Sequence, residues 1–329
     1  MSSLSERRLL PPIPAPRRVT DSPETTDSPG TTELPGATDL PGARSLPGPP
    51  HLPGAVDLSR AAETDATGTG AVPPQSRNRV LAHTAVAAAQ HVLLERYRLA
   101  SPEEAFALLR QASQTHNVKL HTLADALAGS PPPPPGAARW FPGRARHGSP
   151  PLPGLDLDRH ARTQHGAVLR AALHKALHVA GTSMGNLQLA EGGVLRLEKH
   201  SGLPRRFTDF FAFVEDSTTS CALAARRHDQ VTVRDVATAT VFDEASRQVI
   251  LDAGSRACHS VPLLTEEGRL AGVVSTHHAR PLSDLSQVQY DALDKLGRVV
   301  GRWLSWHRRT LVLDALEHLH ASGIAAAGA

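Results

Sequence analysis

The chain has 329 residues, 40% of them hydrophobic, and a formal net charge of only +3. Its two cysteines, Cys221 and Cys258, are too few for a disulfide framework or a four-cysteine metal site. No run of eighteen apolar residues could cross a membrane, and the N-terminus lacks the apolar core of a signal peptide. We therefore expect a cytoplasmic protein with about two folded domains and some unfolded chain.

Residues 1–76 carry a hexapeptide near-repeat with proline at positions 23, 29, 35, 41, 47 and 53. Proline in every turn would remove the donors of a β-helix, and collagen needs a period of three. The pattern predicts a disordered, turn-rich tail. A proline-motif docking site near PPIPAPRR is the alternative.

Residues 77–129 are predicted to form three short helices. The first has apolar residues on one face at Leu81, Ala85, Ala88, Val92 and Leu93 and ends near Tyr97. The second starts at Ser101-Pro102-Glu103-Glu104, where an N-cap hydroxyl and a glutamate satisfy backbone donors reciprocally. The third buries Leu120, Leu123, Ala124 and Leu127. Such a small core favours a surface for a partner over a catalytic pocket.

Three strings in this segment resemble the ANTAR domain, the RNA-binding module of bacterial transcription antitermination regulators. They are LLERY (93–97), EEAFALLRQAS (103–113) and N-x-K-L-x-x-L-A (117–124). The resemblance implies binding to paired RNA stem-loops upstream of a terminator. Departures are Leu94, His91 and Thr84, where the family often has Met, Gly and Arg. The positions that match the family pattern, and where we expect RNA contact, are Ala89, Arg110, Ser113, Asn117 and Lys119.

The charges alone do not decide this interpretation. Residues 77–127 hold six Lys and Arg against four Asp and Glu, a surplus too small to indicate nucleic acid unaided. Arg110 and Lys119 could be ordinary solvated helix residues. A guanidinium and an ammonium suit phosphate contacts, however, and Asn and Ser suit exposed loop bases.

A proline-rich linker follows at residues 130–160 and is expected to hold two domains apart. Its Trp140 and Phe141 could stack on bases, or could dock back onto a domain, which we favour.

Residues 161–320 change to an α/β pattern that predicts a central antiparallel sheet. A helix ends at Gly181, and strands 185–190 and 194–200 flank a Glu191-Gly192-Gly193 turn. Short helices, a strand at 230–236, two strands around the turn 266–268 and a long final helix complete the pattern.

The strings MGNLQL (184–189), FFAFVEDSTTSCALAARR (210–227), VTVRDV (231–236) and SVPLLTEEGRLAGVVSTH (260–277) resemble a GAF domain of the kind that accompanies ANTAR in actinobacteria. The resemblance implies a small-molecule or cofactor pocket under the inserted helices, or a role in dimer formation alone. No ligand is fixed by the sequence. The family's usual order places the sensor before ANTAR, whereas here ANTAR comes first.

An enzyme is the less favoured interpretation. Cys221 could be a nucleophile with His259 or His278 as its base, but no triad spacing is present. A buried structural cysteine is the better expectation. His277 and His278 are adjacent on a strand and so point to opposite faces, which makes a metal site there weak.

The final helix, residues 284–318, carries an apolar seam of Ala292, Leu296, Val299, Trp303, Trp306 and Leu313. We expect its second half to pair in parallel with a second protomer and form a homodimer. The competing possibility is that both tryptophans fold back onto their own domain.

These observations predict a non-catalytic, RNA-binding antitermination regulator whose GAF domain senses a small molecule or a redox signal. The alternative is a signalling or scaffold protein whose ANTAR segment binds protein instead of RNA. Affinity that falls with salt would separate the two, because phosphate contacts release counterions.

Overall fold

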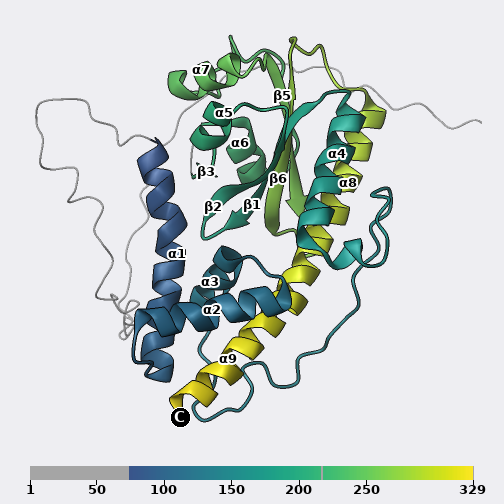
Figure 1. Ribbon diagram of the computed structural model, residues 1–329. Coiled ribbons are helices and arrows are strands. Elements are labelled where there is room, and N and C mark those ends of the chain that lie inside the picture. The colour runs from purple at the N-terminus through teal and green to yellow at the C-terminus, as the bar shows by residue number, and fades with distance from the viewer. Residues whose placement is uncertain (1–73, 216–217, 329) are drawn as a thin grey trace, which may run out of the picture. The chain divides into compact units, whose positions relative to one another are not determined.

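The computed structural model describes residues 74–215 and 218–328 (Figure 1). The predictions for the N-terminal repeat and its docking motif lie outside these residues. These described residues form one compact unit. Within the described ranges, no helix is both long enough and apolar enough to cross a membrane.

Three helices open the described chain: α1 (Pro74–Tyr97), α2 (Pro102–His116) and α3 (Leu120–Gly129). The predicted start of α2 is confirmed, because the Ser101 side chain accepts a hydrogen bond from the Glu104 backbone N–H at 3.3 Å. The Glu104 carboxylate reaches back one residue further than a standard capping box and accepts from the Ala100 N–H at 2.9 Å. Asn117 ends the helix in the left-handed conformation, with φ 50°.

The apolar face of α1 differs from the predicted one by a single position. Ala88 is exposed, and the buried residues are Ala89, Leu93 and Tyr97, spaced four apart. Alanine occupies both 88 and 89, so composition could not separate the two faces. The side chain of Leu81 lies outside the described part of α1.

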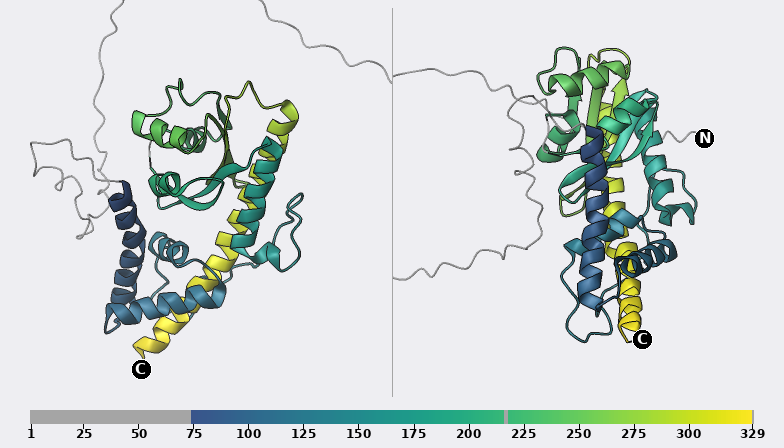
Figure 2. Two further views of the ribbon diagram at one scale, coloured as in Figure 1. Left: turned by 45° about the horizontal axis from the view of Figure 1, so that its top comes forward. Right: turned by 60° about the vertical axis from the view of Figure 1, so that its left-hand side comes forward.

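A fourth helix closes this module from the far end of the chain. Helix α9 (Leu313–Ala327) places Ala315, Leu316 and Leu319 in the same core as the buried residues of α1, α2 and α3. Figure 2 shows α9 running beside these helices toward the C-terminus. The Tyr97 hydroxyl meets His320 Nδ1 at 2.8 Å. The module is therefore a four-helix core built from two distant segments of the chain.

The linker joins the domains instead of separating them, so that expectation was wrong. Trp140 is 3% exposed in the four-helix core, donates its ring N–H to the Pro131 carbonyl at 2.8 Å, and lies under the Arg96 guanidinium. The Trp140 and Phe141 backbone N–H groups donate to Glu317, and Arg144 pairs with Asp314, both on α9. The favoured expectation that the two aromatic residues dock back onto a domain is confirmed.

The second part of the unit is built on a six-stranded antiparallel sheet in the order β3-β2-β1-β6-β5-β4. Its strands are β1 (Met184–Glu191), β2 (Val194–Ser201), β3 (Phe213–Val214), β4 (Val231–Val233), β5 (Ala257–Leu264) and β6 (Leu270–His278). Its helices are α4 (His165–Ala180), α5 (Arg205–Phe210), α6 (Ser220–Arg227), α7 (Glu244–Asp252) and α8 (Gln287–His307), with a 3-10 turn at Ala161–Thr163. The predicted fold class, helical module plus antiparallel α/β domain, is confirmed.

Two layers of helices cover the sheet (Figure 1). Leu187 and Leu189 face a core shared with α4 and α8, whereas Leu195 and Val273 belong to the core under α5, α6 and α7. Helix α8 lies directly on β5 because Gly297 and Gly301 meet the strand backbone. A Cβ at Gly297 would stand 2.6 Å from the Pro262 carbonyl oxygen, and one at Gly301 would overlap Leu264.

Helix α8 continues through a π-helical turn (Arg308–Val312) into α9, so the final helix is longer than predicted. Its apolar seam packs within the chain: Trp303 is fully buried and donates to the Arg162 carbonyl, and Trp306 donates to the His147 carbonyl. We expected this helix to pair with a second protomer because we judged its apolar seam too large for one domain to bury. That premise was wrong. The core between the sheet and α4 and α8, together with the linker, covers Leu296, Val299 and Trp303, and the four-helix module covers Leu313.

Candidate nucleic-acid interface

The five predicted RNA-contact residues do not form one open surface. Ala89 is fully buried in the helical core and is not accessible to a nucleic acid in this arrangement. Arg110 is exposed on α2, and its side chain has no ion pair or hydrogen bond with any described residue. The Ser113 hydroxyl donates to the Val118 carbonyl at 2.6 Å and thereby stabilises the turn between α2 and α3. Arg110 is thus the predicted residue most available for a phosphate.

The other two, Asn117 and Lys119, contact the α/β part of the chain. The Asn117 amide donates to the Gln164 side chain at 2.6 Å, just before α4. The Lys119 ammonium pairs with the Glu198 carboxylate on β2, which is 1% exposed, while the lysine itself remains 40% exposed. The turn between α2 and α3 is therefore one place at which the two domains meet.

His121 extends this contact by lying between two carboxylates of the β1–β2 hairpin. Its Nδ1 is 3.2 Å from Glu191 Oε2 and its Nε2 is 3.2 Å from Glu198 Oε1. Burial opposes a charge on the ring, but the two carboxylates outweigh it and raise the pKa of His121. Burial likewise opposes ionisation of Glu198, yet its bonds to His121 and Lys119 lower the pKa of that carboxyl to about 2.

A bulge in the sheet presents Glu198 to the helical module. Leu187 of β1 pairs with Lys199 and Gln188 pairs with Leu197, so Glu198 is the extra residue that the register skips. A bulge of this kind re-aims a side chain and ends regular alternation. Sequence reasoning placed this strand correctly but missed Glu198, Glu191 and His121, because nothing local marks a bulge or a partner some 79 residues away.

Arg196 and Asp125 complete the cluster. The Arg196 guanidinium lies 3.6 Å from both Asp125 Oδ2 and Glu191 Oε2, and it stacks over Phe213 at 4.9 Å. Burial and the nearby Glu191 charge raise the pKa of Asp125. The ligand atoms of His121, Asp125 and Glu191 lie within 4.8 Å of one another, as a metal site would require. The arginine already supplies the positive charge there, so these residues suit an ion-pair network better than a cation site.

The comparisons with known proteins agree with this division. The ANTAR domain model matches residues 75–127, and the GAF domain model matches residues 159–304. The chain carries an ANTAR domain followed by a GAF domain. A comparison with curated proteins gives no match.

Several solved structures are similar to part of the chain. The GAF domain/HD domain protein from Geobacter sulfurreducens is 14% identical, covers 47% of this chain and 97% of its own, and has a TM-score of 0.38. The GAF domain of Acinetobacter phosphoenolpyruvate-protein phosphotransferase is 14% identical, with 44% and 83% covered and a TM-score of 0.37. The fRMsr of Staphylococcus aureus in its reduced form is 14% identical, with 41% and 82% covered and a TM-score of 0.33. The domain assignment rests on the family models.

The interior of the GAF domain carries a row of buried polar side chains on the face under α5 and α6. His277 Nδ1 lies 3.0 Å from the Ser255 hydroxyl and its Nε2 lies 3.2 Å from Asn186 Oδ1. Burial lowers the pKa of His277 to about 3. The Gln188 amide donates to the Phe211 carbonyl, and its Oε1 is buried without a hydrogen-bond partner in the described structure. An unsatisfied buried acceptor of this kind suits a donor group on a ligand.

Both cysteines lie in this interior. Cys221 is 8% exposed and Cys258 is fully buried, and neither is in a disulfide. Burial raises the pKa of both thiols, that of Cys258 to about 12. A protonated, inaccessible thiol is a poor nucleophile and a poor target for oxidation.

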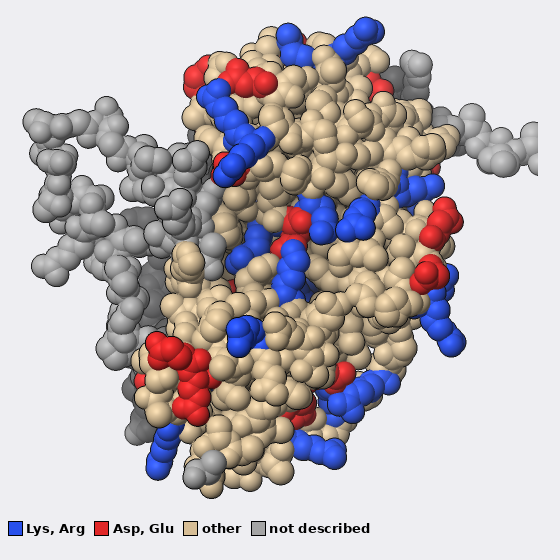
Figure 3. Space-filling model, viewed as in Figure 1, with Lys and Arg blue, Asp and Glu red and all other residues tan. Residues whose placement is uncertain are grey.

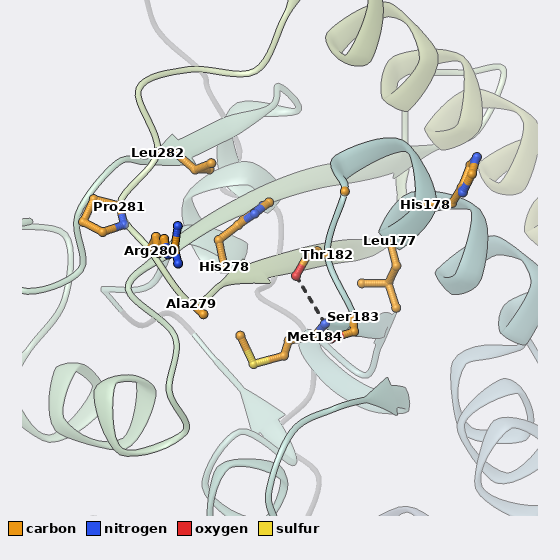
Figure 4. A pocket seen from close by; sticks show the side chains of 11 residues that line it. Leu177, His178, Thr182, Ser183, Met184, His278, Ala279, Arg280, Pro281 and Leu282 are labelled. Atoms are coloured by element: carbon orange, nitrogen blue, oxygen red, sulfur yellow. Dashed lines mark hydrogen bonds between the residues drawn. The ribbon is translucent and has the colours of Figure 1, made fainter.

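A separate open pocket of about 700 Å³ lies where α4 and β6 end and β1 begins (Figure 4). Its wall mixes apolar side chains with His278 and Arg280, and Thr182 accepts a hydrogen bond from the Met184 N–H beside it. This pocket is on the surface of the GAF domain and does not reach the polar row.

Proposed function

We propose that this protein is an RNA-binding regulator of transcription antitermination whose GAF domain senses a small molecule and acts directly on the RNA-binding face of the ANTAR domain. The observation that carries the proposal is the contact of Asn117 and Lys119, two predicted RNA-contact residues, with Gln164 and Glu198 of the GAF domain. We further propose a cytoplasmic location and paired stem-loops in leader transcripts as the RNA partner.

The geometry supplies a route from sensor to RNA. Strand β2 turns Leu195 toward the core under α5, where the polar row lies, and turns Glu198 toward the ANTAR domain. A ligand that shifts β2 changes how Glu198 holds Lys119 and His121, and so changes how much positive charge the ANTAR turn offers to phosphate. The order of the domains along the chain is no obstacle, because they touch at this turn.

A small molecule is the signal that we favour over thiol oxidation. The buried thiols of Cys221 and Cys258 have raised pKa values, which argues against both a redox sensor and a cysteine enzyme. We accordingly propose that the protein has no catalytic activity. The scaffold alternative keeps the same folds and replaces RNA with a protein partner.

A gel shift with the full chain tests the proposal. The probe is a leader transcript with two adjacent stem-loops from an operon near the gene, and the control is the same RNA with one arm of each stem altered so that neither pairs. We expect binding of the paired RNA that weakens steeply as salt rises. Failure to bind either RNA at low salt would favour the scaffold alternative.

A homodimer is part of the same proposal, since two ANTAR domains could engage two stem-loops at a raised effective concentration. The dimer would have to use a face other than the seam on α8 and α9, whose residues are covered within one chain. Light scattering on the full chain at micromolar concentration, with and without the two-stem-loop RNA, tests it. A monomer under both conditions would refute the dimer and leave RNA binding untouched.

A further inference from the structure

The GAF domain carries a row of positive charges next to the ANTAR turn. The chain contains only four lysines, Lys119, Lys175, Lys199 and Lys295. Lys119 is in the ANTAR turn, Lys199 follows Glu198 on β2, and Lys175 lies on α4. Lys119 and Lys199 therefore lie at the domain junction, Lys175 lies farther along α4, and Lys295 lies elsewhere, on α8.

Contacts tie these residues into one surface. Lys199 Nζ lies over the first turn of α4, 3.9 Å from the position that a Cβ at Gly166 would occupy. Arg170 lies one helical turn after Gly166, on the same face of α4. Burial and the charge of Lys119 lower the pKa of Lys199, whereas the charge of Glu198 raises it. In the view of Figure 3, Lys and Arg side chains gather near the middle of this face around a small acidic group.

Helix α4 extends the row away from the junction. Arg170, His174 and His178 are exposed and recur every four residues, so they share one face of the helix. With Lys175 they line a groove of about 500 Å³ against residues 154–157. Helix α4 contains no Asp or Glu, and Asp156 is the only acid that lines this groove. From Gly166 to His178 the face is about 18 Å long, at roughly 1.5 Å per residue.

Lys199, Arg170 and Lys175 are like charges on neighbouring elements, and Glu198 offsets only part of their repulsion. Neighbouring like charges cost stability, and a polyanion that runs along them removes this cost by releasing counterions. The face begins at Lys119, where we expect RNA, so the same phosphate backbone can continue from one domain onto the other.

We propose that the GAF domain itself binds RNA through a basic ridge of Lys199, Arg170, His174, Lys175 and His178, which continues the RNA-binding surface of the ANTAR domain across the junction. The inference rests on the proposed function, since RNA is the partner in both. It assigns to the GAF domain a second role as part of the RNA-binding surface, beside that of sensor.

The test compares two full-length variants of equal net charge. Arg170→Glu with Lys199→Glu reverses two charges of the ridge, and Arg227→Glu with Lys295→Glu reverses two exposed charges on α6 and α8. The Kd for the two-stem-loop RNA is measured against salt for both variants and the wild type. Thermal melting shows that each variant is folded.

Two phosphate contacts contribute about 1.4 to 1.8 to the slope of log K against log salt. The ridge variant should lose that much slope, which corresponds to roughly fifteen- to thirtyfold weaker binding at about 0.15 M salt. The control variant should keep the wild-type slope. If ridge and control variants bind alike while the wild type binds RNA, the ridge serves something other than RNA and the inference is overturned. If the wild type binds no RNA, the proposed function fails as well.

Discussion

Replacing Glu198 with glutamine tests the contact between the ANTAR and GAF domains most directly. The substitution keeps the volume of the side chain but removes the charge that holds Lys119 and His121. The pKa of Glu198 falls from 4.5 to about 2 in the folded chain. At about 1.4 kcal/mol per pKa unit, the charged form of Glu198 contributes roughly 3 kcal/mol. Because Lys119 is partly exposed and its charge is screened, we expect a loss of about 2 to 3 kcal/mol at neutral pH.

The pH dependence of this loss has a definite sign. A carboxyl whose folded pKa is lowered stabilises the fold above its unfolded value, near 4.5, and the contribution disappears as the pH falls through about 2. His121 has a raised folded pKa, so its contribution is complete below about 6.5 and is lost as the pH rises through the raised value. The difference between wild type and Glu198→Gln should therefore be largest between about pH 4.5 and 6.5.

Urea denaturation of both proteins at pH 2.5, 5.5 and 8.5 measures the effect. Glu266→Gln is the matched control, because the Glu266 carboxylate is 70% exposed and makes a long, solvent-screened ion pair of 3.7 Å with Arg302. This substitution should leave the free energy of unfolding unchanged. A difference below about 0.5 kcal/mol at every pH would show that the buried pair does not hold the domains together.

Three further changes probe the RNA face, the linker and the helix–sheet contact. Arg110→Glu should weaken binding of the two-stem-loop RNA about tenfold and lower the salt slope by about one, whereas Arg227→Glu should not; equal affinities in a gel shift would remove α2 from the RNA face. Trp140→Ala should cost about 3 to 5 kcal/mol in urea denaturation, because it empties a site in the four-helix core. A loss below about 1 kcal/mol would mean that the linker is not docked in solution. Gly301→Ala should lower the Tm, at a cost of about 1 to 3 kcal/mol, since the new methyl group would overlap the β5 backbone. Gly129→Ala, with open space around it, should be neutral or slightly stabilising, and equal Tm values for the two would contradict the close contact.

Local signals explain why so much of the fold could be predicted. The hydroxyl cap at Ser101, the glycine turn between β1 and β2 and the glycine turn between β5 and β6 each depend on residues within a few positions of one another. The family strings then supplied the two domain types. These local signals carry no information about which helix packs against which part of the structure.

The part of the fold that could not be predicted depends on contacts between residues that are far apart in the sequence. Tyr97 and His320 are 223 positions apart, and their contact brings α9 into the ANTAR core. Once α9 is there, the apolar surface that suggested a second protomer is covered by the chain itself. Periodicity reports that a helix face is buried, and it cannot report what buries it.

The candidate site shows the same division. Lys119 and Asn117 could be predicted because they match a family string. Their partners could not, because Glu198 is the extra residue of a sheet bulge and Gln164 is the N-cap residue of α4. From sequence alone, a charged residue on a strand is expected to face solvent, because the pairing register of the strand is not known. Glu198 contradicts this expectation, because its side chain is only 1% exposed.

The continuous final helix gives the two domains a second connection beside the ion-pair cluster. Helix α8 is held against β5 by Gly297 and Gly301, and α9 is part of the ANTAR core, with only the π-helical turn between them. The Arg308 guanidinium in that turn donates to the Ala190 carbonyl, at the end of β1 beside Glu191. A π-helical turn is an irregularity at which a helix can change its twist without breaking. A shift of the β1–β2 hairpin would therefore reach the ANTAR domain both through the carboxylates that hold Lys119 and His121 and through Arg308 at the base of α9. This double connection gives the proposed sensor two physical routes to an ANTAR domain that precedes it in the chain.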